Sequence, residues 1–365
     1  MKIAYVTTNV APKFMQGGVG AKIKRHISIW KDMGHDVKLF CLTPEHLPFI
    51  DSEQFIFKAL LYLPLLSGLT VEISRSLQLS RMLNAIKTYK PDVIYFRFGL
   101  FTFPLHKMYH IAPVFMEVNS NDVEEYKTRG IFFYWLNRIT REIMFHRSTG
   151  LLPVSQEIAD LNKKYNCPTC VVSNGIDLEA FTPLQATTNK APVLSAIGSP
   201  GNWQGMDKLF HLARKFPDLT INIIGDSPLD FSEAIPDNLH IYGFLSRDEI
   251  REIFSNTDAV FSQLALHRKN MKENPTLKVR EALAYGLPLI LAHHDADLID
   301  LETDLILKIP NTEDNLLTHG GVVRDFAYHV IGKRINRELI ATRIDQRKKE
   351  QKRLAFFQEV LAKQK

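Results

Sequence analysis

Short apolar runs alternate with amphipathic stretches along almost the whole chain. The runs are rich in β-branched residues and nearly continuous, which is typical of strands that are covered on both faces of a sheet. They form two series, one in each half of the chain. The predicted strands are Lys2–Thr7, Asp36–Leu42, Asp92–Phe96, Val114–Val118, Gly150–Val154 and Cys170–Ser173, then Val193–Ile197, Thr220–Ile224, His240–Gly243, Ala259–Gln263, Pro288–Ala292 and Asp304–Ile309.

Apolar positions with helical periodicity lie between these runs. Alternation of strands and helices predicts an α/β protein with parallel sheets, because a parallel crossover needs a connection long enough to hold a helix. Two such series predict two Rossmann-like, doubly wound domains, whose ligands bind beyond the carboxyl ends of the strands. The clearest predicted helices are Gly20–Met33, Leu77–Tyr89, Met206–Lys215, Arg247–Asn256 and Thr276–Ala284.

The break between the two halves is expected between 166 and 192, where prolines and a polar run interrupt the helical pattern. We therefore expect an N-terminal domain at 1–168, a linker at 169–191 and a C-terminal domain at 192–339. The final stretch, 340–365, is again helical in pattern and rich in Lys and Arg. It is expected either to stay solvated or to pack back on the first domain through its apolar residues.

The composition is that of a globular protein, since 45% of the residues are hydrophobic and 23% are charged. This excludes disorder, collagen and coiled coil for the chain as a whole, and 365 residues suit two domains. Three cysteines cannot form a disulfide framework, which favours a reducing, cytoplasmic location. The first apolar run is too short for a signal peptide, and the apolar, uncharged stretch 59–71 has 13 residues, too few to span a bilayer.

The formal charge of +5 is unevenly placed, because 333–365 alone carries 11 Lys/Arg and 4 Asp/Glu. Such a tail can attract phosphates or anionic lipid. Nucleic acid is disfavoured as a partner, because the basic residues form one terminal run without interleaved stacking aromatics.

A glycine loop, Gly17-Gly18-Val19-Gly20, follows the first strand and precedes a helix. Glycines at this place let backbone N–H groups approach a ligand, and the helix dipole favours an anion there. The spacing is not that of a dinucleotide fingerprint. A tight turn without a ligand is the alternative.

The segment from Glu273 to Glu281 carries the strongest motif. Pro275 suits the first turn of a helix, because it lacks an N–H that would be unpaired there. Glu273 then precedes the positive end of the helix dipole, and the amides of Thr276 and Leu277 are exposed toward a phosphate. About one and a half turns further on, the Glu281 carboxylate can accept hydrogen bonds from two vicinal hydroxyls of a ribose. The alternative is that both glutamates lie on the surface of an amphipathic helix.

Glu281 is followed by a helix end, a glycine, a proline and a strand, in the order Ala282-Leu283-Ala284-Tyr285-Gly286-Leu287-Pro288-Leu289-Ile290. This block resembles the signature of retaining glycosyltransferases of family 4, which have the GT-B fold, an α/β fold of two facing Rossmann-like domains with an interdomain cleft. That signature also has two glutamates with seven residues between them. Four further segments resemble the family in the same order: Gly17–Gly20, Val172–Asp177, Gly198–Leu209 and Ile223–Phe244.

The resemblance implies a role for each matched position. Glu281 would hold the ribose of a nucleotide sugar, and Glu273 would be a catalytic residue beside the donor sugar. The loop of Gly17 and Gly18 would approach the diphosphate from the other domain. Further donor contacts are implied for Gly198, Ser199, Gln204, Gly225, Phe244, Leu245, Asn274, Thr276 and Leu277.

Three positions depart from the family. Ser199 and Gln204 stand where its members usually carry an Arg and a Lys that offset the charge of the leaving diphosphate. We expect Lys278 to replace them as a catalytic residue; the alternative is an ordinary lysine on the helix surface. Asn119 stands where many members have a histidine. We expect it, with Asn121, to hydrogen-bond the acceptor, although an amide cannot act as a general base.

The resemblance thus implies a retaining glycosyltransferase that moves a sugar from a nucleotide-diphosphate sugar to a hydroxyl of a glycan or lipid-linked acceptor, as in the synthesis of cell-surface polysaccharide or glycolipid. No cofactor and no metal are expected, because helix N-termini and a lysine can stabilise the leaving diphosphate. Two alternatives are a nucleotide-sugar epimerase of the same fold and a catalytically silent partner subunit, the latter suggested by Ser199 and Gln204.

Several segments have two interpretations. Phe55–Leu69 and the aromatic, basic run Ile131–Arg147 either meet anionic lipid at the inner face of a membrane or face the core as ordinary helices. Cys167 and Cys170 have the spacing of a metal-binding pair, but no second pair accompanies them. His293-His294-Asp295 follows a strand end and is expected to be a solvated loop, not a metal site.

Overall fold

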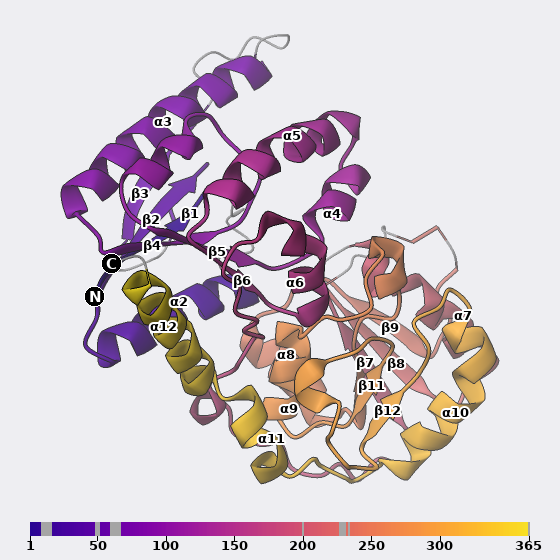
Figure 1. Ribbon diagram of the computed structural model, residues 1–365. Helices are drawn as coiled ribbons and strands as arrows, with labels where there is room; N and C mark the ends of the chain where they lie inside the picture. Colours follow the sequence, from indigo (N-terminus) through magenta and orange to yellow (C-terminus); the bar gives the residue numbers. More distant parts are fainter. Residues whose placement is uncertain are drawn as a thin grey trace. The chain divides into compact units, whose positions relative to one another are not determined.

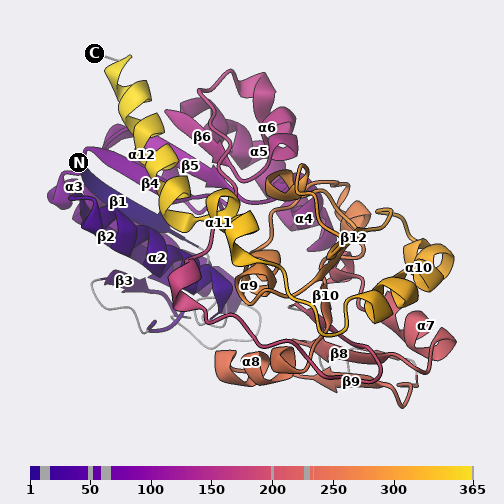
Figure 2. The same ribbon diagram turned by 90° about the horizontal axis from the view of Figure 1, so that it is seen from below.

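The computed structural model of the chain describes residues 1–8, 17–47, 52–58, 67–198, 201–225, 231–232 and 234–363. They form two compact units (Figure 1 and Figure 2). The first unit comprises Met1–Val172 and Arg347–Lys365, and the second comprises Ser173–Gln346. The chain therefore leaves the first unit once, completes the second without interruption, and then returns. Ser199 and residues 59–69, which make up most of the expected segment Phe55–Leu69, lie outside the residues whose side chains the structure describes.

The first unit is built on a parallel six-stranded sheet with strand order β3-β2-β1-β4-β5-β6. Residues 3–7 of the central strand β1 are buried, because helices cover both faces of the sheet. Figure 1 shows α3 and α5 on one face and α2 and α12 on the other. The strands are β1 (Lys2–Thr7), β2 (Asp36–Thr43), β3 (Ser52–Ile56), β4 (Val93–Arg97), β5 (Val114–Val118) and β6 (Gly150–Pro153). The helices are α2 (Gly18–Asp32), α3 (Ser67–Tyr89), η1 (Leu105–His110), α4 (Asp122–Thr128), α5 (Ile131–Arg147), α6 (Gln156–Asn162), η2 (Lys163–Tyr165) and α12 (Gln346–Ala362).

The second unit repeats this architecture, with a parallel sheet in the order β12-β11-β10-β7-β8-β9. Counted from its own first strand, the order 3-2-1-4-5-6 is the same as in the first unit, and it is the order of dinucleotide-binding folds. Its strands are β7 (Val193–Ile197), β8 (Thr220–Ile224), β9 (Leu239–Tyr242), β10 (Ala259–Phe261), β11 (Leu289–Leu291) and β12 (Ile306–Lys308). Its helices are η3 (Leu178–Ala180), η4 (Asn202–Gln204), α7 (Asp207–Lys215), α8 (Arg247–Ser255), η6 (Leu266–Lys269), α9 (Leu277–Ala284), η7 (Ala296–Leu298), α10 (Asn315–His329) and α11 (Arg337–Ile344).

The basic C-terminal helix α12 completes the core of the first unit. Its side chains at Leu354, Phe356, Phe357 and Val360 join the hydrophobic cluster that lines one face of the sheet. The indole Nε1 of Trp30 in α2 donates a hydrogen bond of 2.8 Å to Glu350 Oε2. The C-terminal tail therefore packs on the first unit and is not solvated, because its apolar face is buried in the core of that unit.

Three expectations of secondary structure need correction. The strand expected at Cys170–Ser173 does not form; this segment only hydrogen-bonds beside β6, through Cys170 N to Leu151 O (3.0 Å) and Val172 N to Pro153 O (3.0 Å). The edge strand β3 was not expected. The single C-terminal helix is two helices, α11 and α12, which are interrupted at Asp345. No helix in the described part of the chain is long and apolar enough to cross a membrane.

Candidate active site

The strand order of the second unit reverses between β7 and β10, so the loops after these two strands diverge and leave a crevice. Gly198 follows β7, and Gln263 follows β10 by two residues. The expected donor-binding positions in this unit come from the loops at this end of the sheet and from the start of α9. Ser199 lies outside the described residues.

Two glycines bring the loops after β7 and β8 into backbone contact. Gly225 has φ +104°, and a Cβ on it would lie 2.0 Å from the carbonyl oxygen of Gly198. Both the conformation and the contact require glycine at position 225. A Cβ on Gly198 would lie 2.7 Å from Lys278 Nζ and 3.0 Å from Gln204 Cδ. The structure thus brings four of the expected site residues together.

Lys278 is the cation of this cluster. Its Nζ donates a hydrogen bond of 2.7 Å to Gln204 Oε1, and its side chain is half-buried. It is therefore not an ordinary lysine on the helix surface. Gln204, at the position where the family usually has a lysine, orients this ammonium through its amide oxygen.

The N-terminus of α9 is held in place by the loop that resembles the family's Asn-Gly turn. Thr276 is the N-cap, and its Oγ1 accepts a hydrogen bond of 3.3 Å from the backbone N–H of Val279. Asn174 Nδ2 donates to the carbonyl oxygen of Pro275 (2.7 Å), and Arg280 Nε donates to the carbonyl oxygen of Asn174 (2.7 Å). Two motifs a hundred residues apart in sequence therefore fix one helix start.

A buried ion-pair cluster lies beneath α9. The Arg280 guanidinium is fully buried and contacts Asp295 at 2.7 and 2.9 Å and Asp297 at 2.6 Å. Asp297 also accepts a hydrogen bond of 2.7 Å from Ser173 Oγ. Breaking such a buried pair by removing one partner leaves a charge without compensation. Arg280 therefore holds α9 to the loop after β11, and sequence patterns alone gave no sign of it.

The cluster corrects two expectations about 293–297. His293 and Asp295 are buried, so this segment is not a solvated loop, although His294 is exposed. Burial lowers the pKa of His293 to about 4, so the ring is neutral at pH 7. The expectation of metal-free chemistry rested in part on the absence of an Asp-x-Asp sequence, but Asp295 and Asp297 form one. Both carboxylates bind Arg280, so they are not free to hold a divalent cation.

Glu273 and Asn274 lie in the extended segment before α9. Glu273 forms a β-bridge with His294, and its side chain is half-buried. Asn274 does not cap α9. Its Nδ2 donates to Gln263 Oε1 (2.7 Å), and its backbone N–H donates to the carbonyl oxygen of His294 (3.0 Å). This segment is thereby fixed to the loops after both β10 and β11.

Glu281 lies on α9, with its side chain partly shielded from solvent. Burial raises the pKa of its carboxyl above the ordinary value, and the positive charge of Arg247 acts against that rise. The turn after β9 approaches the same helix, because Leu245 packs on the cluster that includes Val279 and Ala282. Phe244 in this turn is 66% exposed. The exposed ring and the shielded carboxylate are both suited to a nucleoside.

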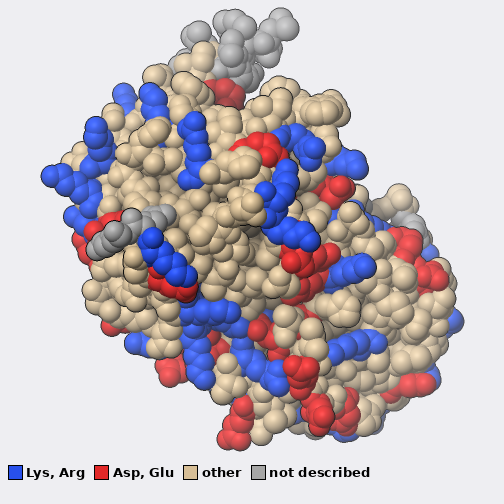
Figure 3. All heavy atoms as spheres, viewed as in Figure 1, with Lys and Arg blue, Asp and Glu red and all other residues tan. Residues whose placement is uncertain are grey.

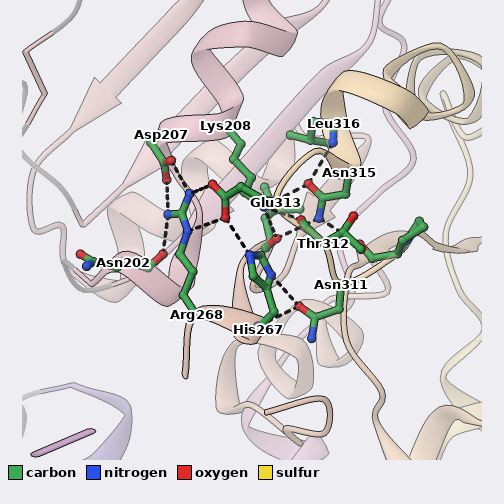
Figure 4. A network of polar contacts seen from close by, with 12 residues as sticks. Asn202, Asp207, Lys208, His267, Arg268, Asn311, Thr312, Glu313, Asn315 and Leu316 are labelled. Atoms are coloured by element: carbon green, nitrogen blue, oxygen red, sulfur yellow. Dashed lines mark hydrogen bonds and ion pairs between the residues drawn. The ribbon is translucent and has the colours of Figure 1, made fainter. Parts of the chain in front are cut away.

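A second polar network holds the loop that precedes α7 (Figure 4). Arg268 contacts Asp207 at 2.8 and 3.0 Å, Glu313 through a short ion pair, and the carbonyl oxygen of Asn202 at 2.9 Å. Lys208 donates to the carbonyl oxygens of Thr312 (2.7 Å) and Leu264 (3.1 Å). These cations are committed to the protein, and the network keeps the loop of Gln204 in position. Sequence reasoning missed it, because its members are ordinary charged residues far apart in sequence.

The first unit has its own polar cluster at the same kind of strand-order reversal, between β1 and β4. Glu117 at the end of β5 is fully buried and contacts Lys22 Nζ at 2.6 Å and Arg97 at 2.9 Å. Burial alone would raise the pKa of Glu117, but the two cations hold it well below its usual range. Burial in turn lowers the pKa of Lys22 to about 8. Lys22 also donates to Asn119 Oδ1 at 3.2 Å, which places Asn119 beside the cluster.

A cavity of about 530 Å³ opens beyond these strand ends in the first unit. Three arginines and one carboxylate line it, together with aromatic side chains and Asn119. The lining residues are Val19, Leu42, Pro44, Phe57, Arg75, Arg97, Phe98, Gly99, Leu100, Asn119, Ser120, Glu125, Tyr126, Arg129 and Phe133. Its size suits a sugar-sized ligand.

The other residues singled out in the first unit do not line this cavity. Asn121 is not among the lining residues; its Oδ1 accepts from the backbone N–H of Glu124 (3.4 Å) and caps α4. Gly17 is the N-cap of α2, and both Gly17 and Gly18 are exposed. Cys167 Sγ contacts the carbonyl oxygen of Ser148 at 3.2 Å. The described part of the chain contains no group of His, Cys, Asp and Glu arranged to hold a metal ion.

Comparison with known proteins agrees with this architecture. Residues 16–180 match Glycosyltransferase Family 4. Sucrose-phosphate synthase from Thermosynechococcus elongatus has a TM-score of 0.68 at 14% identity over 99% of both chains. The lipopolysaccharide outer core galactosyltransferase WaaB has a TM-score of 0.66 at 14% identity over all of both chains. HepE from Anabaena, in complex with UDP-glucose, has a TM-score of 0.65 at 14% identity over 98% of this chain and all of its own. No curated protein sequence matches the chain.

Two doubly wound units, each with polar side chains at the carboxyl ends of its strands, give the chain the GT-B fold that glycosyltransferases of known structure share over nearly its whole length. Residues 16–180, somewhat less than half of the chain, are similar to Glycosyltransferase Family 4. The expected fold class is thus confirmed.

Proposed function

We propose that the protein is a retaining, metal-independent glycosyltransferase that moves a sugar from a nucleotide-diphosphate sugar to a hydroxyl of a glycan or lipid-linked acceptor. The observation that carries this proposal is the cluster of Gly198, Gln204, Gly225 and Lys278 at the strand-order reversal of the second unit, beside the N-terminus of α9. At this one place a ligand can approach the backbone closely at two glycines, the Lys278 ammonium is held by a hydrogen bond, and the positive end of the α9 dipole lies nearby. Diphosphates are bound by just these three features.

The nucleoside would lie between the turn after β9 and α9. The exposed Phe244 ring offers a face for a base, and Glu281 offers two acceptor oxygens for vicinal ribose hydroxyls. One solved structure of the same fold, HepE, is in complex with the nucleotide sugar UDP-glucose, and another, the pneumococcal O-GlcNAc transferase GtfA, is in complex with UDP and GlcNAc. They support a nucleotide sugar as the donor class.

The chemistry follows from the charge that develops during the reaction. When the glycosidic bond lengthens, negative charge builds up on the diphosphate oxygens. The Lys278 ammonium and the N–H groups at the start of α9 would stabilise that charge without a divalent cation. Glu273 would stabilise the positive charge that develops at the anomeric carbon. The departing phosphate would take the proton of the acceptor hydroxyl, so that attack occurs on the face that the phosphate leaves.

The acceptor would occupy the cavity of the first unit. Asn119 provides an amide there for hydrogen bonds to a hydroxyl group, and the aromatic walls suit the apolar faces of a sugar ring. Each of the three lining arginines is paired with a carboxylate: Arg97 with Glu117 (2.9 Å), Arg129 with Glu125 (2.7 Å) and Arg75 with Glu72 (3.2 Å). Their charge is therefore offset within the protein, and the cavity itself does not select for an anionic acceptor. WaaB, named for lipopolysaccharide outer core synthesis, is consistent with a lipid-linked glycan as the acceptor class.

Isothermal titration with UDP-, GDP- and ADP-sugars tests the donor site. Glu281→Ala should weaken binding of the preferred donor by about 1–3 kcal/mol, because the hydrogen bonds to the ribose are lost. Glu252→Ala, an exposed glutamate on α8, is the control and should bind normally. Unchanged affinity of Glu281→Ala would contradict the ribose role, and no binding of any nucleotide sugar would favour the silent subunit.

Two further measurements separate the remaining alternatives. Proton NMR of the product distinguishes retention from inversion at the anomeric carbon. Isomerisation of the nucleotide sugar in the absence of any acceptor would instead identify an epimerase. Full transfer in the presence of a chelator is the result expected of metal-independent chemistry.

A further inference from the structure

The first unit holds a second cavity, of about 570 Å³, between α3 and η1, which pack against each other. None of its described lining residues also lines the cavity beyond the strand ends. Two of them, Lys87 and Ile111, shortly precede β4 and β5 in the chain. This second cavity therefore lies toward the amino ends of these strands, whereas the sugar transfer proposed above uses the carboxyl ends.

The polar side chains that line this cavity are basic or neutral. Lys87 lies on α3, and His106, Lys107 and His110 lie on η1. No carboxylate is among the described residues that line it, and the sequence has no Asp or Glu from 93 to 116. Figure 3 shows that Lys and Arg predominate over Asp and Glu on the surface above α3. A concave site lined by charges of one sign raises the local concentration of the opposite ion, here an anion.

The cations of this cavity are not neutralised within the protein. Lys87, Lys107 and His110 form no hydrogen bond and no ion pair with any residue that the structure describes. The arginines of the first cavity differ, because each of them is paired with a carboxylate. Burial lowers the pKa of His106, and the neighbouring basic groups Arg147, Lys107 and His110 lower it further. A bound anion would offset this repulsion between positive charges.

The His106 ring is held in place without the use of its nitrogens. Phe101 stacks on the ring, with centroids 6.3 Å apart and planes inclined by 20°. The ring of Phe103 lies 5.5 Å away. Neither ring nitrogen of His106 is hydrogen-bonded to a residue in the described part of the chain. The N–H groups of this imidazole are therefore available to the oxygens of an anion.

Other lining groups suit the carbon skeleton of an organic anion. Leu83 and Pro104 are buried and give the cavity an apolar wall. Ser80 and Asn84 lie four residues apart on α3, so they share one face of the helix with Lys87. Ser80 Oγ already donates to the carbonyl oxygen of Ser76 (2.9 Å), so its lone pairs are left for a ligand hydroxyl. The Asn84 amide both donates and accepts.

We propose that the cavity between α3 and η1 binds a small phosphorylated molecule of the size of a sugar phosphate. Lys87 and Lys107 would pair with the phosphate, because a lysine ammonium acts as a point charge that binds phosphate well. Two such charges match a phosphate monoester, which carries about 1.5–2 negative charges at neutral pH, whereas a carboxylate carries one. A volume of about 570 Å³ exceeds the size of inorganic phosphate and lies in the usual range of small-molecule sites. The inference goes beyond the proposed sugar transfer and does not depend on it.

Isothermal titration at pH 7.5 with three probes of similar size tests the proposal: glucose 6-phosphate, glucuronate and glucose. The wild-type protein should bind glucose 6-phosphate at least tenfold more tightly than glucuronate, and glucose should not bind. Lys87→Ser with Lys107→Ser should weaken binding of glucose 6-phosphate at least tenfold. Lys163→Ser with Lys190→Ser, which removes two exposed lysines that do not line the cavity, is the matched control and should bind like the wild type. Equal binding of glucuronate and glucose 6-phosphate, or no binding of either, would overturn the proposal.

Two further measurements exclude binding at the donor site, whose lysine also suits a phosphate. Lys278→Ala should leave the affinity for glucose 6-phosphate unchanged. In proton NMR, saturation with glucose 6-phosphate should raise the pKa of His106 by about 0.5–1 unit, because the anion stabilises the imidazolium. His106→Gln identifies the resonance, and His329 of the second unit is the control and should not respond. Loss of binding in Lys278→Ala, or an unchanged pKa of His106 at saturation, would overturn the proposal.

Discussion

Replacing Gly198 with alanine adds one methyl group at the centre of the proposed diphosphate site. The backbone at this position is outside the left-handed region, so alanine is tolerated there. The new Cβ would lie 2.7 Å from Lys278 Nζ, whereas ordinary van der Waals contact begins at 3.4 Å. The ammonium must therefore withdraw by about 0.7 Å, and Gln204 with it. The contacts are with the ends of flexible side chains, so the fold should tolerate the change.

A misplacement of roughly 1 Å in a catalytic group can lower the rate by about 100-fold. We therefore expect kcat/KM of Gly198→Ala to fall by about 10- to 100-fold, or about 1.4–2.7 kcal/mol, with a melting temperature within a few degrees of the wild type. A coupled assay for release of the nucleoside diphosphate measures the rate. Gly321→Ala on α10, where a Cβ meets nothing within 4 Å, is the control and should retain full activity. Full activity of Gly198→Ala would refute the placement of the diphosphate beside Lys278.

Three further predictions concern buried charge. Arg280→Met should lower the free energy of unfolding by about 3–5 kcal/mol, because Asp295 is left buried without a partner; Arg324→Met, which breaks only the surface pair with Asp218, should cost less than about 1 kcal/mol in the same urea titration. Similar losses in both variants would contradict the buried cluster. Between pH 6.5 and pH 4 the free energy of unfolding should fall by about 3 kcal/mol through His293, because its pKa of about 4 in the folded state lets only the unfolded state bind the proton. His293→Asn should reduce this slope, and an unchanged slope would rule His293 out as its source. As the pH is lowered, donor affinity should begin to fall at a higher pH than it would with an ordinary glutamate, because the raised pKa of Glu281 means that its carboxylate is protonated at a higher pH. Glu281→Gln should bind the donor weakly at every pH and should not show this loss of affinity with falling pH.

The fold was predictable from the sequence where strands are covered on both faces. β1, β5, β7 and β8 have the predicted bounds, because a nearly continuous apolar run leaves no other reading for a buried parallel strand. β3 was not predicted because it is an edge strand whose sequence is largely polar. Each of its residues is only half-buried, so it lacks the continuous apolar run of a buried strand. The run at Cys170–Ser173 is apolar, but Pro153 in β6 has no N–H to donate to Cys170, so the ladder does not continue beyond the bridge between Leu151 and Thr169.

The candidate site was predictable only in part. Spacing indicated α9 and its glutamates, and the glycines indicated the loops that approach each other. The partners of Lys278 and Arg280 could not be predicted, because tertiary structure chooses them from residues 74 positions before and 15 positions after in sequence. The same is true of α5, since helical periodicity shows that one face is apolar without showing that Phe132, Trp135 and Ile139 on that face are exposed.

The return of the chain to its first unit sets an order on the folding of a newly made molecule. The cluster beneath the N-terminal sheet needs Leu354, Phe357 and Val360 of α12, which are synthesised only after the whole second unit. The second unit, in contrast, is one uninterrupted stretch that can close as soon as it has emerged. The unit whose synthesis begins first therefore completes its core last, and a stop codon before Gln346 would release a protein whose first unit has an open core.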